Sequence, residues 1–241
     1  MRGYVDLHCH YLPAIDDGVR SLEDGVRLLT GLHAIGYDVV VATPHIRTAM
    51  FENRKPGLEA AYAAFVDLVR GVPGLPDTGL GAEHFCDDVF WSLFQADCAV
   101  PYPGGKAALV EFPAEFIPRR VEERFFEMHV RGVVAVLAHP ERYPPLFKST
   151  DGLDPVLEVG ALPLLDVMSL VGKYGRAPQK AAERMLEEGV YYAACTDCHR
   201  PGDVEIVAEA IARLERLVGK EEAVELLAEN PRRILEGTAE P

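Results

Sequence analysis

The sequence predicts an α/β fold in which about seven strands form a distorted (β/α)7 TIM-like barrel. Apolar, strand-like runs alternate with helical patterns along the 241 residues, which is typical of parallel sheets. Polar side chains stand at the carboxyl ends of most of these runs, where β/α barrels carry their active sites. An open sheet would instead gather such residues around one switch point. Because the polar ends are spread over many strands, the barrel is favoured.

The first strand–helix–strand unit spans residues 4–43. Ser21 can cap its helix, with Asp24 in the reciprocal capping position, and Gly36 is suited to end it. The β-branched run 38–43 is typical of a strand buried on both faces. Further helices are predicted at 58–69, 121–129, 153–159, 181–188, 204–218 and 220–228, and further strands at 79–83, 107–112, 133–138, 162–167 and 190–196.

Charge and composition limit the partners and the compartment. A formal net charge of −14 argues against a nucleic-acid backbone or an anionic membrane as the main partner. No run approaches the roughly 18–20 apolar residues of a membrane span, and no signal-peptide run precedes the first strand. Five cysteines, an odd number, suit a reducing cytoplasm. We expect one cytoplasmic domain, residues 1–241, and leave its oligomeric state open.

Two histidines at the end of the first strand suggest a metal site. Residues i and i+2 of a strand point to the same face, so His8 and His10 can aim at one point. Taken alone, a His-x-His pair more often belongs to a surface strand. Here an acidic pair, Asp16 and Asp17, follows in a loop. Later strand ends add imidazole and carboxylate groups that suit a divalent metal, namely His45, Glu83, Glu111, His139, Asp197 and His199.

These residues fall within short motifs that occur in a fixed order. The motifs are Asp6-Leu7-His8-Cys9-His10, Asp16-Asp17-Gly18, Thr43-Pro44-His45, Gly81-Ala82-Glu83, Val110-Glu111-Phe112-Pro113, Ala138-His139-Pro140-Glu141-Arg142-Tyr143 and Thr196-Asp197-Cys198-His199. In combination they resemble the PHP (polymerase and histidinol phosphatase) superfamily, and within it the bacterial capsular and exopolysaccharide tyrosine phosphatases of the CpsB/CapC type. The resemblance spans nearly the whole chain and implies the PHP fold in a single metal-dependent phosphatase domain.

The resemblance also implies three divalent metal ions. Mn²⁺ is preferred, and Fe²⁺ or Zn²⁺ would also suit nitrogen and oxygen ligands without thiolate. The implied ligands are His8, His10, Glu83 and Asp197 for one ion, Glu83, Glu111 and His139 for the second, and Asp17, His45 and His199 for the third. Asp16 is left to orient a ligand.

Hydrolysis would then proceed by attack of a metal-bound hydroxide on phosphorus. Arg142 is the expected phosphate contact and transition-state stabiliser, because a guanidinium matches phosphate geometry in a forked contact. His199 or His45 could supply a proton if its metal position is vacant. Arg47 and Arg200 are further candidate substrate contacts. The family often has a second arginine several residues after the last ligand, and whether Arg200 replaces it is left open.

The leading hypothesis is a protein-tyrosine phosphatase. The resemblance suggests a bacterial tyrosine kinase tail as its phosphotyrosine substrate, with a role in capsule or exopolysaccharide synthesis. One alternative is a PHP phosphoesterase for a small molecule, such as histidinol phosphate. An alternative of another class is a metal-free regulatory or binding module. A nuclease is disfavoured by the acidic charge.

The cysteines and His84 lie in or beside the motifs and could have structural roles only. Cys195 and Cys198 form a Cys-x-x-Cys pattern, but it spans a strand end and not a helix start, so a redox role is disfavoured. Cys9 and Cys198 alternate with ligands and are expected to point away from the metals. His84 could line the pocket or cover the barrel mouth, and both remain open.

Overall fold

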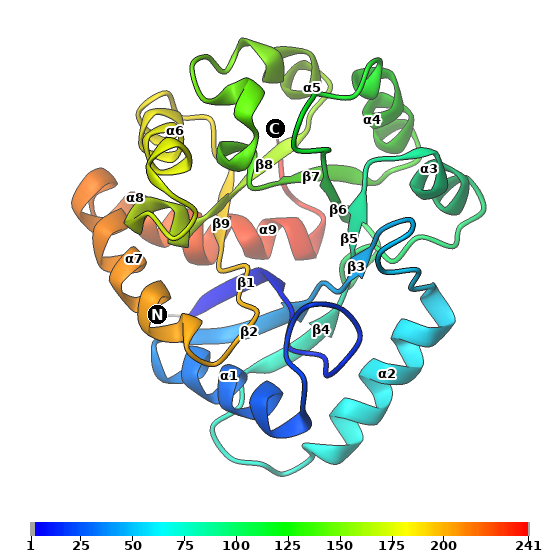
Figure 1. Cartoon of the computed structure of the whole chain (residues 1–241), viewed down its shortest axis with the longest axis vertical. Helices are drawn as coiled ribbons and strands as arrows, with labels where there is room; N and C mark the ends of the chain where they lie inside the picture. The colour runs from blue at the N-terminus through cyan, green and yellow to red at the C-terminus, as the bar shows by residue number, and fades with distance from the viewer. Residues whose placement is uncertain (1–2, 241) are drawn as a thin grey trace.

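The computed structural model describes residues 3–240, so Met1, Arg2 and Pro241 of the expected domain lie outside it. Within that range the strands form two parallel sheets, and helices surround them (Figure 1). The first sheet has the order β1 (Tyr4–Cys9), β2 (Tyr37–Ala42) and β4 (Asp77–Leu80). The second has the order β3 (His45–Ile46), β5 (Glu83–Phe85), β6 (Ala107–Glu111), β7 (Val134–Ala138), β8 (Leu162–Asp166) and β9 (Ala193–Cys195).

Two neighbouring pairs of strands, β2–β3 and β4–β5, are each separated by a short break. β2 ends at Ala42 and continues as β3 after Pro44, which has no N–H to donate to a ladder. The predicted strand 79–83 is wrong as one element, since it joins the end of β4 to the start of β5. The Gly81 N–H donates to Ala42 O (2.8 Å) and the Glu83 N–H donates to Pro44 O (3.1 Å), so both neighbours stay paired across the break.

The last strand lies beside the first. Beyond β9, the Asp197 N–H donates to His8 O (2.8 Å) and the His10 N–H donates to Cys198 O (2.9 Å). Cys9 and Cys198 form a parallel bridge between these bonds. The strands therefore follow one another around a ring whose final seam is a short contact at the carboxyl ends, and this short seam distorts the barrel.

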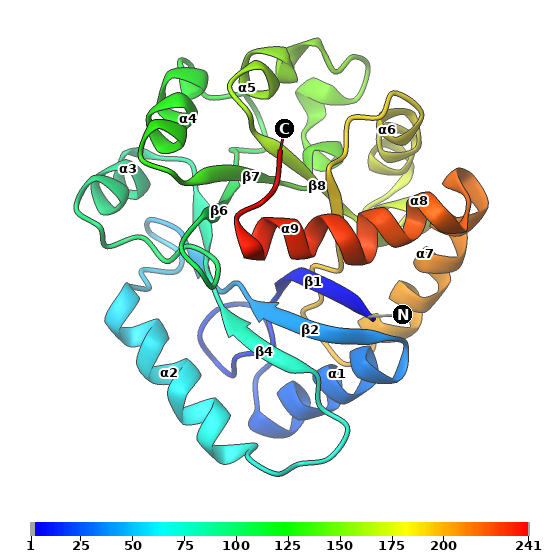
Figure 2. The same ribbon diagram turned by 180° about the vertical axis from the view of Figure 1, so that it is seen from behind.

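Alternate residues of the strands face two different cores, as the period of a strand requires. The inner cluster is lined by residues from many strands, including Val5, Leu7, Val41, Leu109, Val136, Ala138, Leu164, Ala193 and Cys195. Their sequence neighbours, including Val40, Ala42, Ala108, Val110, Leu137, Leu165 and Ala194, pack under the surrounding helices. Helix α9 (Asn230–Glu236) crosses the amino ends of the strands, and its Ile234 joins the inner cluster (Figure 2).

The helices that cover the outer face agree largely with the predicted ranges. They are α1 (Leu22–Ala34), α2 (Lys55–Leu68), α3 (Asp88–Gln95), α4 (Val121–Val130), α5 (Asp154–Glu158), α6 (Arg176–Glu187), α7 (Asp203–Val218) and α8 (Lys220–Val224). The capping of α1 is confirmed, because Ser21 Oγ accepts the Asp24 N–H (3.1 Å). Helix α3 was not predicted, and α6 begins earlier than expected. None of the helices within residues 3–240 is long and apolar enough to cross a membrane.

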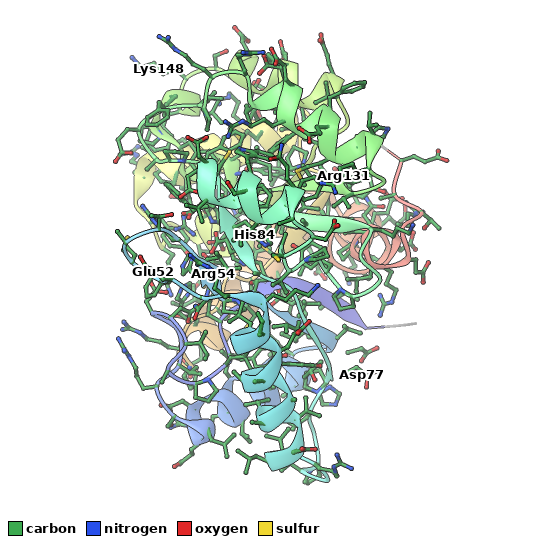
Figure 3. All side chains as sticks on the ribbon, turned by 90° about the vertical axis from the view of Figure 1, so that its right-hand side faces the viewer. Glu52, Arg54, Asp77, His84, Arg131 and Lys148 are labelled. Atoms are coloured by element: carbon green, nitrogen blue, oxygen red, sulfur yellow. The ribbon has the colours of Figure 1, made fainter. Side chains whose placement is uncertain are left out.

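The two ends of the strands lie on opposite sides of the molecule. Asp77 begins β4, whereas Glu52 and Arg54 lie in the segment that follows β3. Figure 3 shows Asp77 on one side and Glu52 and Arg54 on the other. The carboxyl end, which carries the predicted ligands, is therefore separated by the whole barrel from α9.

Candidate metal centre

Seven of the nine predicted ligands lie near the carboxyl end of a strand or in the segment that follows it. His45 and Glu83 begin the short strands β3 and β5, which follow β2 and β4, and the donor atoms of all nine converge. They form four overlapping groups in which all donor atoms lie within 4.8 Å of one another. The groups are His10, Asp17, His45 and His199; His8, His10 and Asp197; His8, Glu83 and His139; and His45, Glu83 and Glu111. The convergence fits the predicted site, while metal binding by these residues stays a prediction.

Glu83 stands at the centre of the cluster. Its Oε1 lies 3.3 Å from His8 Nε2 and 3.1 Å from His139 Nε2. Its Oε2 lies 2.8 Å from His45 Nδ1 and 3.7 Å from His10 Nε2. A carboxylate whose two oxygens face different imidazoles can bridge two cations, as the family resemblance implies.

Two further carboxylates complete the opposite sides of the cluster. Asp197 Oδ1 lies 3.1 Å from His8 Nε2 and 3.3 Å from His10 Nε2. Asp17 Oδ1 lies 3.4 Å from His45 Nε2 and 3.5 Å from His199 Nε2. Asp17 therefore lies with the two imidazoles expected for the third ion.

The side chains that surround Glu111 differ from the ligand set that the family resemblance implies for the second ion. Glu111 lies with His45 and Glu83, whereas His139 lies with His8 and Glu83. No group of donor atoms among residues 3–240 joins Glu111 directly to His139. How the nine side chains divide among individual ions therefore stays a prediction.

Unpaired buried atoms show that the cluster fits cations. Buried polar atoms normally have hydrogen-bond partners, since an unpaired one is costly. Seven buried side-chain atoms of the candidate ligands have no partner in hydrogen-bonding geometry within the described chain, namely His8 Nε2, His10 Nε2, His45 Nδ1, Glu83 Oε2, Glu111 Oε2, His139 Nδ1 and Asp197 Oδ1. Imidazole nitrogens and carboxylate oxygens without thiolate suit Mn²⁺, Fe²⁺ or Zn²⁺. Cys9 and Cys198 belong to the outer hydrophobic core, as expected.

Hydrogen bonds behind the cluster orient the imidazoles. His8 Nδ1 lies 2.7 Å from Thr43 Oγ1, and His10 Nδ1 lies 2.7 Å from Asp16 Oδ2. The same Asp16 oxygen accepts the His45 backbone N–H (3.0 Å). Contacts of this kind fix which ring nitrogen faces a metal. The supporting role expected for Asp16 agrees with this geometry.

The electrostatics of the cluster favour bound positive charge. Burial alone would lower the pKa of His45, but the carboxylates of Glu83 and Asp17 raise it to about 12. Burial and the Glu83 carboxylate raise the pKa of Glu111 to about 7. Burial and the nearby Arg142 lower the pKa of His139 to about 4. Protons and divalent cations therefore compete for the same atoms, so we expect metal affinity to fall in acid.

Two of the candidate ligands have unusual backbone conformations. His139 has φ +33° and Asp197 has φ +47°, in the left-handed region that favours glycine. Each directly or closely follows a strand, β7 or β9. Such conformations cluster at functional sites, where the surrounding structure holds them. They place both side chains in the cluster.

Arg142 lies beside the cluster, at the end of a 3₁₀ turn, Pro140–Arg142. Its Nη1 donates to Asp197 Oδ2 (2.5 Å) and lies 3.6 Å from Asp166 Oδ2. The guanidinium carbon lies 4.3 Å from the ring centroid of Tyr174. The predicted phosphate contact is thus adjacent to a candidate ligand. Asp166 and Tyr174 were not predicted, although Asp166 ends a strand as the candidate ligands do.

The other predicted substrate contacts differ in their placement. Arg47 Nη1 lies 3.7 Å from Glu111 Oε2, and its guanidinium carbon lies 4.3 Å from the Phe85 ring centroid. Arg200 is exposed, and its backbone N–H donates to Asp203 Oδ2 (3.0 Å). Within residues 3–240, no ion pair or side-chain hydrogen bond joins Arg200 to the cluster. Arg47 is therefore the better-placed second arginine.

His84 has a structural position. It is fully buried, with Nδ1 2.9 Å from Leu109 O. Its Nε2 accepts the Val100 N–H (3.1 Å). Burial lowers the pKa of His84 to about 4, which agrees with a neutral ring that donates once and accepts once. The centroid of its ring lies 4.8 Å from that of Phe90 in α3, so the side chain packs under an outer helix. Neither open alternative, lining the pocket or covering the barrel mouth, describes this position.

Comparison with known proteins places the chain among proteins of capsule synthesis. The family model described as "Capsular polysaccharide synthesis, CpsB/CapC" matches residues 4–236. The tyrosine-protein phosphatase YwqE of Bacillus subtilis (strain 168) is 27% identical over 238 residues, which cover 94% of this chain and 92% of YwqE. The tyrosine-protein phosphatase CpsB of Streptococcus pneumoniae is 24% identical over 241 residues, which cover 96% of this chain and 98% of CpsB.

Solved structures confirm the predicted fold class. A crystal structure from work on YwqE and CpsB, described as unique metal-dependent tyrosine phosphatases, has a TM-score of 0.89 at 24% identity, covering 98% of this chain and 95% of that chain. The lactonase Lmo2620 of Listeria monocytogenes has a TM-score of 0.56 at 14% identity, covering 97% of this chain and 94% of the lactonase. From the match over residues 4–236, the chain belongs to the CpsB/CapC family of capsular polysaccharide synthesis proteins.

Proposed function

We propose that this chain is a metal-dependent protein-tyrosine phosphatase, which hydrolyses phosphotyrosine to tyrosine and phosphate. The observation that carries the proposal is the convergence of nine imidazole and carboxylate side chains, several with unpaired buried donor atoms, next to Arg142. YwqE and CpsB, which resemble the chain over nearly its whole length, are named tyrosine-protein phosphatases. Family membership and site geometry therefore support the same reaction.

The proposed site holds three divalent cations, with Mn²⁺ preferred, between the nine side chains. Bound cations supply Lewis acidity, which activates water and neutralises phosphate charge. Arg142 binds phosphate oxygens through a forked contact and stabilises the charge that builds up on them. Arg47, beside Glu111, is the proposed second contact.

The reaction breaks the bond between phosphorus and the phenol oxygen and forms a bond from phosphorus to water oxygen. A phenol with a pKa of about 10 is a good enough leaving group to need little help from an acid. His199 and His45 are the imidazoles of the cluster with the most exposed side chains, 25% and 12%. Either one is the proposed source of the proton that the phenolate takes up when its metal position is vacant.

The physiological setting is proposed from weaker support. The family description, capsular polysaccharide synthesis, supports a bacterial tyrosine kinase tail as the phosphotyrosine substrate. Five free cysteines, four of them buried, support a reducing cytoplasm. Strands β1, β2, β6, β7, β8 and β9 share one inner core, which supports a single domain.

The test is phosphate release from a phosphotyrosine peptide, p-nitrophenyl phosphate and histidinol phosphate. The protein is first chelated and then supplied with Mn²⁺, Fe²⁺ or Zn²⁺. We expect turnover of the peptide only with metal. Faster turnover of histidinol phosphate would favour the small-molecule phosphoesterase, and no metal-dependent turnover of any ester would favour the binding module. His10→Gln should lose activity, whereas His129→Gln, at an exposed position in α4, should keep it.

A further inference from the structure

Arg142 is enclosed by side chains from three separate segments. Asp197 follows β9 and accepts from Nη1, while Asp166, at the end of β8, lies 3.6 Å from the same nitrogen. The Tyr174 ring lies over the guanidinium group, with 4.3 Å from the carbon to the ring centroid. Only 27% of the Arg142 side chain is exposed. The guanidinium orientation is therefore constrained from several directions.

One carboxylate oxygen of Asp166 accepts a backbone hydrogen bond, and the other faces Arg142. The residue is fully buried, and its Oδ1 accepts the Met168 N–H (2.9 Å). Its Oδ2 has no hydrogen-bond partner within the described chain and faces Arg142. A buried carboxylate is costly unless a charge or donor compensates it. The guanidinium of Arg142 is the nearby positive charge and lowers the pKa of Asp166, although burial and the Asp197 carboxylate still hold that pKa above its usual range.

A neighbouring glutamate fixes the two segments relative to each other. Glu141 precedes Arg142 and is fully buried. Its Oε1 accepts the Asp166 backbone N–H (3.1 Å) and the Ser169 hydroxyl (2.9 Å). Its Oε2 accepts the Tyr191 hydroxyl (3.0 Å). The turn that carries Arg142 is therefore tied to the end of β8, so the Asp166 carboxylate has a fixed direction.

Tyr174 completes the enclosure. Its ring face interacts with the guanidinium as a cation–π pair. The Tyr174 ring therefore covers one face of the guanidinium plane, while Asp166 approaches Nη1.

We propose that Asp166 and Tyr174 are positioning residues for Arg142. They hold the guanidinium in one orientation beside the metal cluster and leave the N–H groups not engaged by Asp197 to bind a phosphate oxygen. A guanidinium held in this way loses less side-chain freedom when phosphate binds. This inference rests on the proposed phosphatase function, which supplies the phosphate that Arg142 would bind.

The test is a double-mutant cycle on the full-length, metal-loaded protein. The variants are Asp166→Asn, Tyr174→Phe, Tyr174→Leu, Arg142→Ala and the double variants with Arg142→Ala. The measurements are kcat and KM for a phosphotyrosine peptide and, independently of turnover, the Kd of inorganic phosphate by calorimetry. Asp166→Asn should weaken phosphate binding and kcat/KM about tenfold in the parent protein but less than about twofold in Arg142→Ala.

Tyrosine variants separate the ring from the hydroxyl. Tyr174→Leu should lose more phosphate affinity than Tyr174→Phe, because only Leu removes the ring face over Arg142. Tyr62→Phe is the matched control, since that hydroxyl donates to Thr78 O (2.8 Å) beside β4, and it should leave phosphate affinity unchanged. If Asp166→Asn fails to fold, the Tyr174→Leu cycle tests the same coupling, since Tyr174 is only partly buried.

The proposal would be overturned if a variant of Asp166 or Tyr174 lost phosphate affinity by the same factor in the parent protein and in Arg142→Ala. Equal factors would mean that the residue acts independently of Arg142. Unchanged phosphate affinity in both Asp166→Asn and Tyr174→Leu would also overturn it. Metal content and melting temperature are measured for each variant, so that loss of metal or fold is recognised. If the parent protein binds phosphate with the expected coupling yet hydrolyses no ester, the proposed function fails while the positioning role stands.

Discussion

At the scale of single residues, Asp16 holds two candidate ligands at once. One carboxylate oxygen contacts His10 Nδ1 (2.7 Å) and accepts the His45 N–H (3.0 Å). We predict that Asp16→Ala lowers the affinity for Mn²⁺ about 10- to 100-fold, as for other residues that orient metal-bound histidines. Competition with a chelator of known affinity measures the change.

A matched variant controls for loss of surface charge. Asp151→Ala removes a carboxylate from an exposed position in another loop, so its metal affinity should equal that of the parent protein. If Asp16→Ala binds Mn²⁺ as tightly as Asp151→Ala, then Asp16 does not orient the candidate ligands.

The cysteines should differ sharply in reactivity. Cys98 is exposed, whereas Cys86 is buried, and burial raises the pKa of the Cys86 thiol to about 12. Because the thiolate is the reactive form, we predict that one thiol per chain is alkylated rapidly at pH 8 in the native protein. Mass spectrometry should place the label on Cys98, and Cys98→Ser should abolish it. Rapid labelling of Cys86 would contradict its burial.

The sequence predicts the candidate ligands better than their neighbours for a physical reason. His45, Glu83 and Glu111 are polar groups that end an apolar run or closely follow one, where packing of the core does not require a polar side chain. Asp166 also ends an apolar strand, so the same pattern indicates that its carboxylate lies near the candidate ligands. No sequence pattern marks Tyr174, because its contact with Arg142 depends on how the segment after β8 folds back.

At the scale of elements, the βα alternation was predictable and the interruptions were not. A break between β4 and β5 depends on pairing with the equally broken β2–β3, which a local pattern does not contain. Helix α3 was missed although Asp87 can cap it and apolar Phe90 and Phe94 recur at helical spacing. It has eight residues, and such a short apolar run is ambiguous between strand and helix.

The cap of α3 supplies a test at this scale. Asp87 Oδ1 accepts the Phe90 N–H (2.9 Å) at the start of the helix. We predict that Asp87→Ala lowers the free energy of unfolding by about 1 kcal/mol, since that is the usual cost of removing an N-cap. Urea unfolding measures the loss. Asp88→Ala, which removes a surface ion pair with Arg124, should cost less, and the reverse order would contradict this role of Asp87.

At the scale of the whole molecule, the candidate metal centre joins segments that are distant in sequence. Its candidate ligands come from β1, β3, β5 and β6 and from the segments after β1, β7 and β9. They also flank the seam, where only short backbone contacts hold β9 beside β1. Cations bound there would link the first strand to the last. Metal binding should therefore stabilise the complete barrel and not only one loop.

We accordingly predict that chelation lowers the melting temperature and that Mn²⁺ restores it. Free metal at a hundredfold excess over its Kd adds about 3 kcal/mol per site, because it binds only the folded state. For a chain of this size, that corresponds to roughly 5–10 °C per occupied site, which differential scanning calorimetry resolves.

The increase in melting temperature on adding Mn²⁺ should be smaller at pH 5.5 than at pH 7.5, because Glu111, with its pKa raised to about 7, must lose a proton to bind a cation. His129→Gln should show the same increase as the parent protein and His10→Gln a smaller one. Equal increases in both variants would show that Mn²⁺ stabilises the protein somewhere other than this cluster.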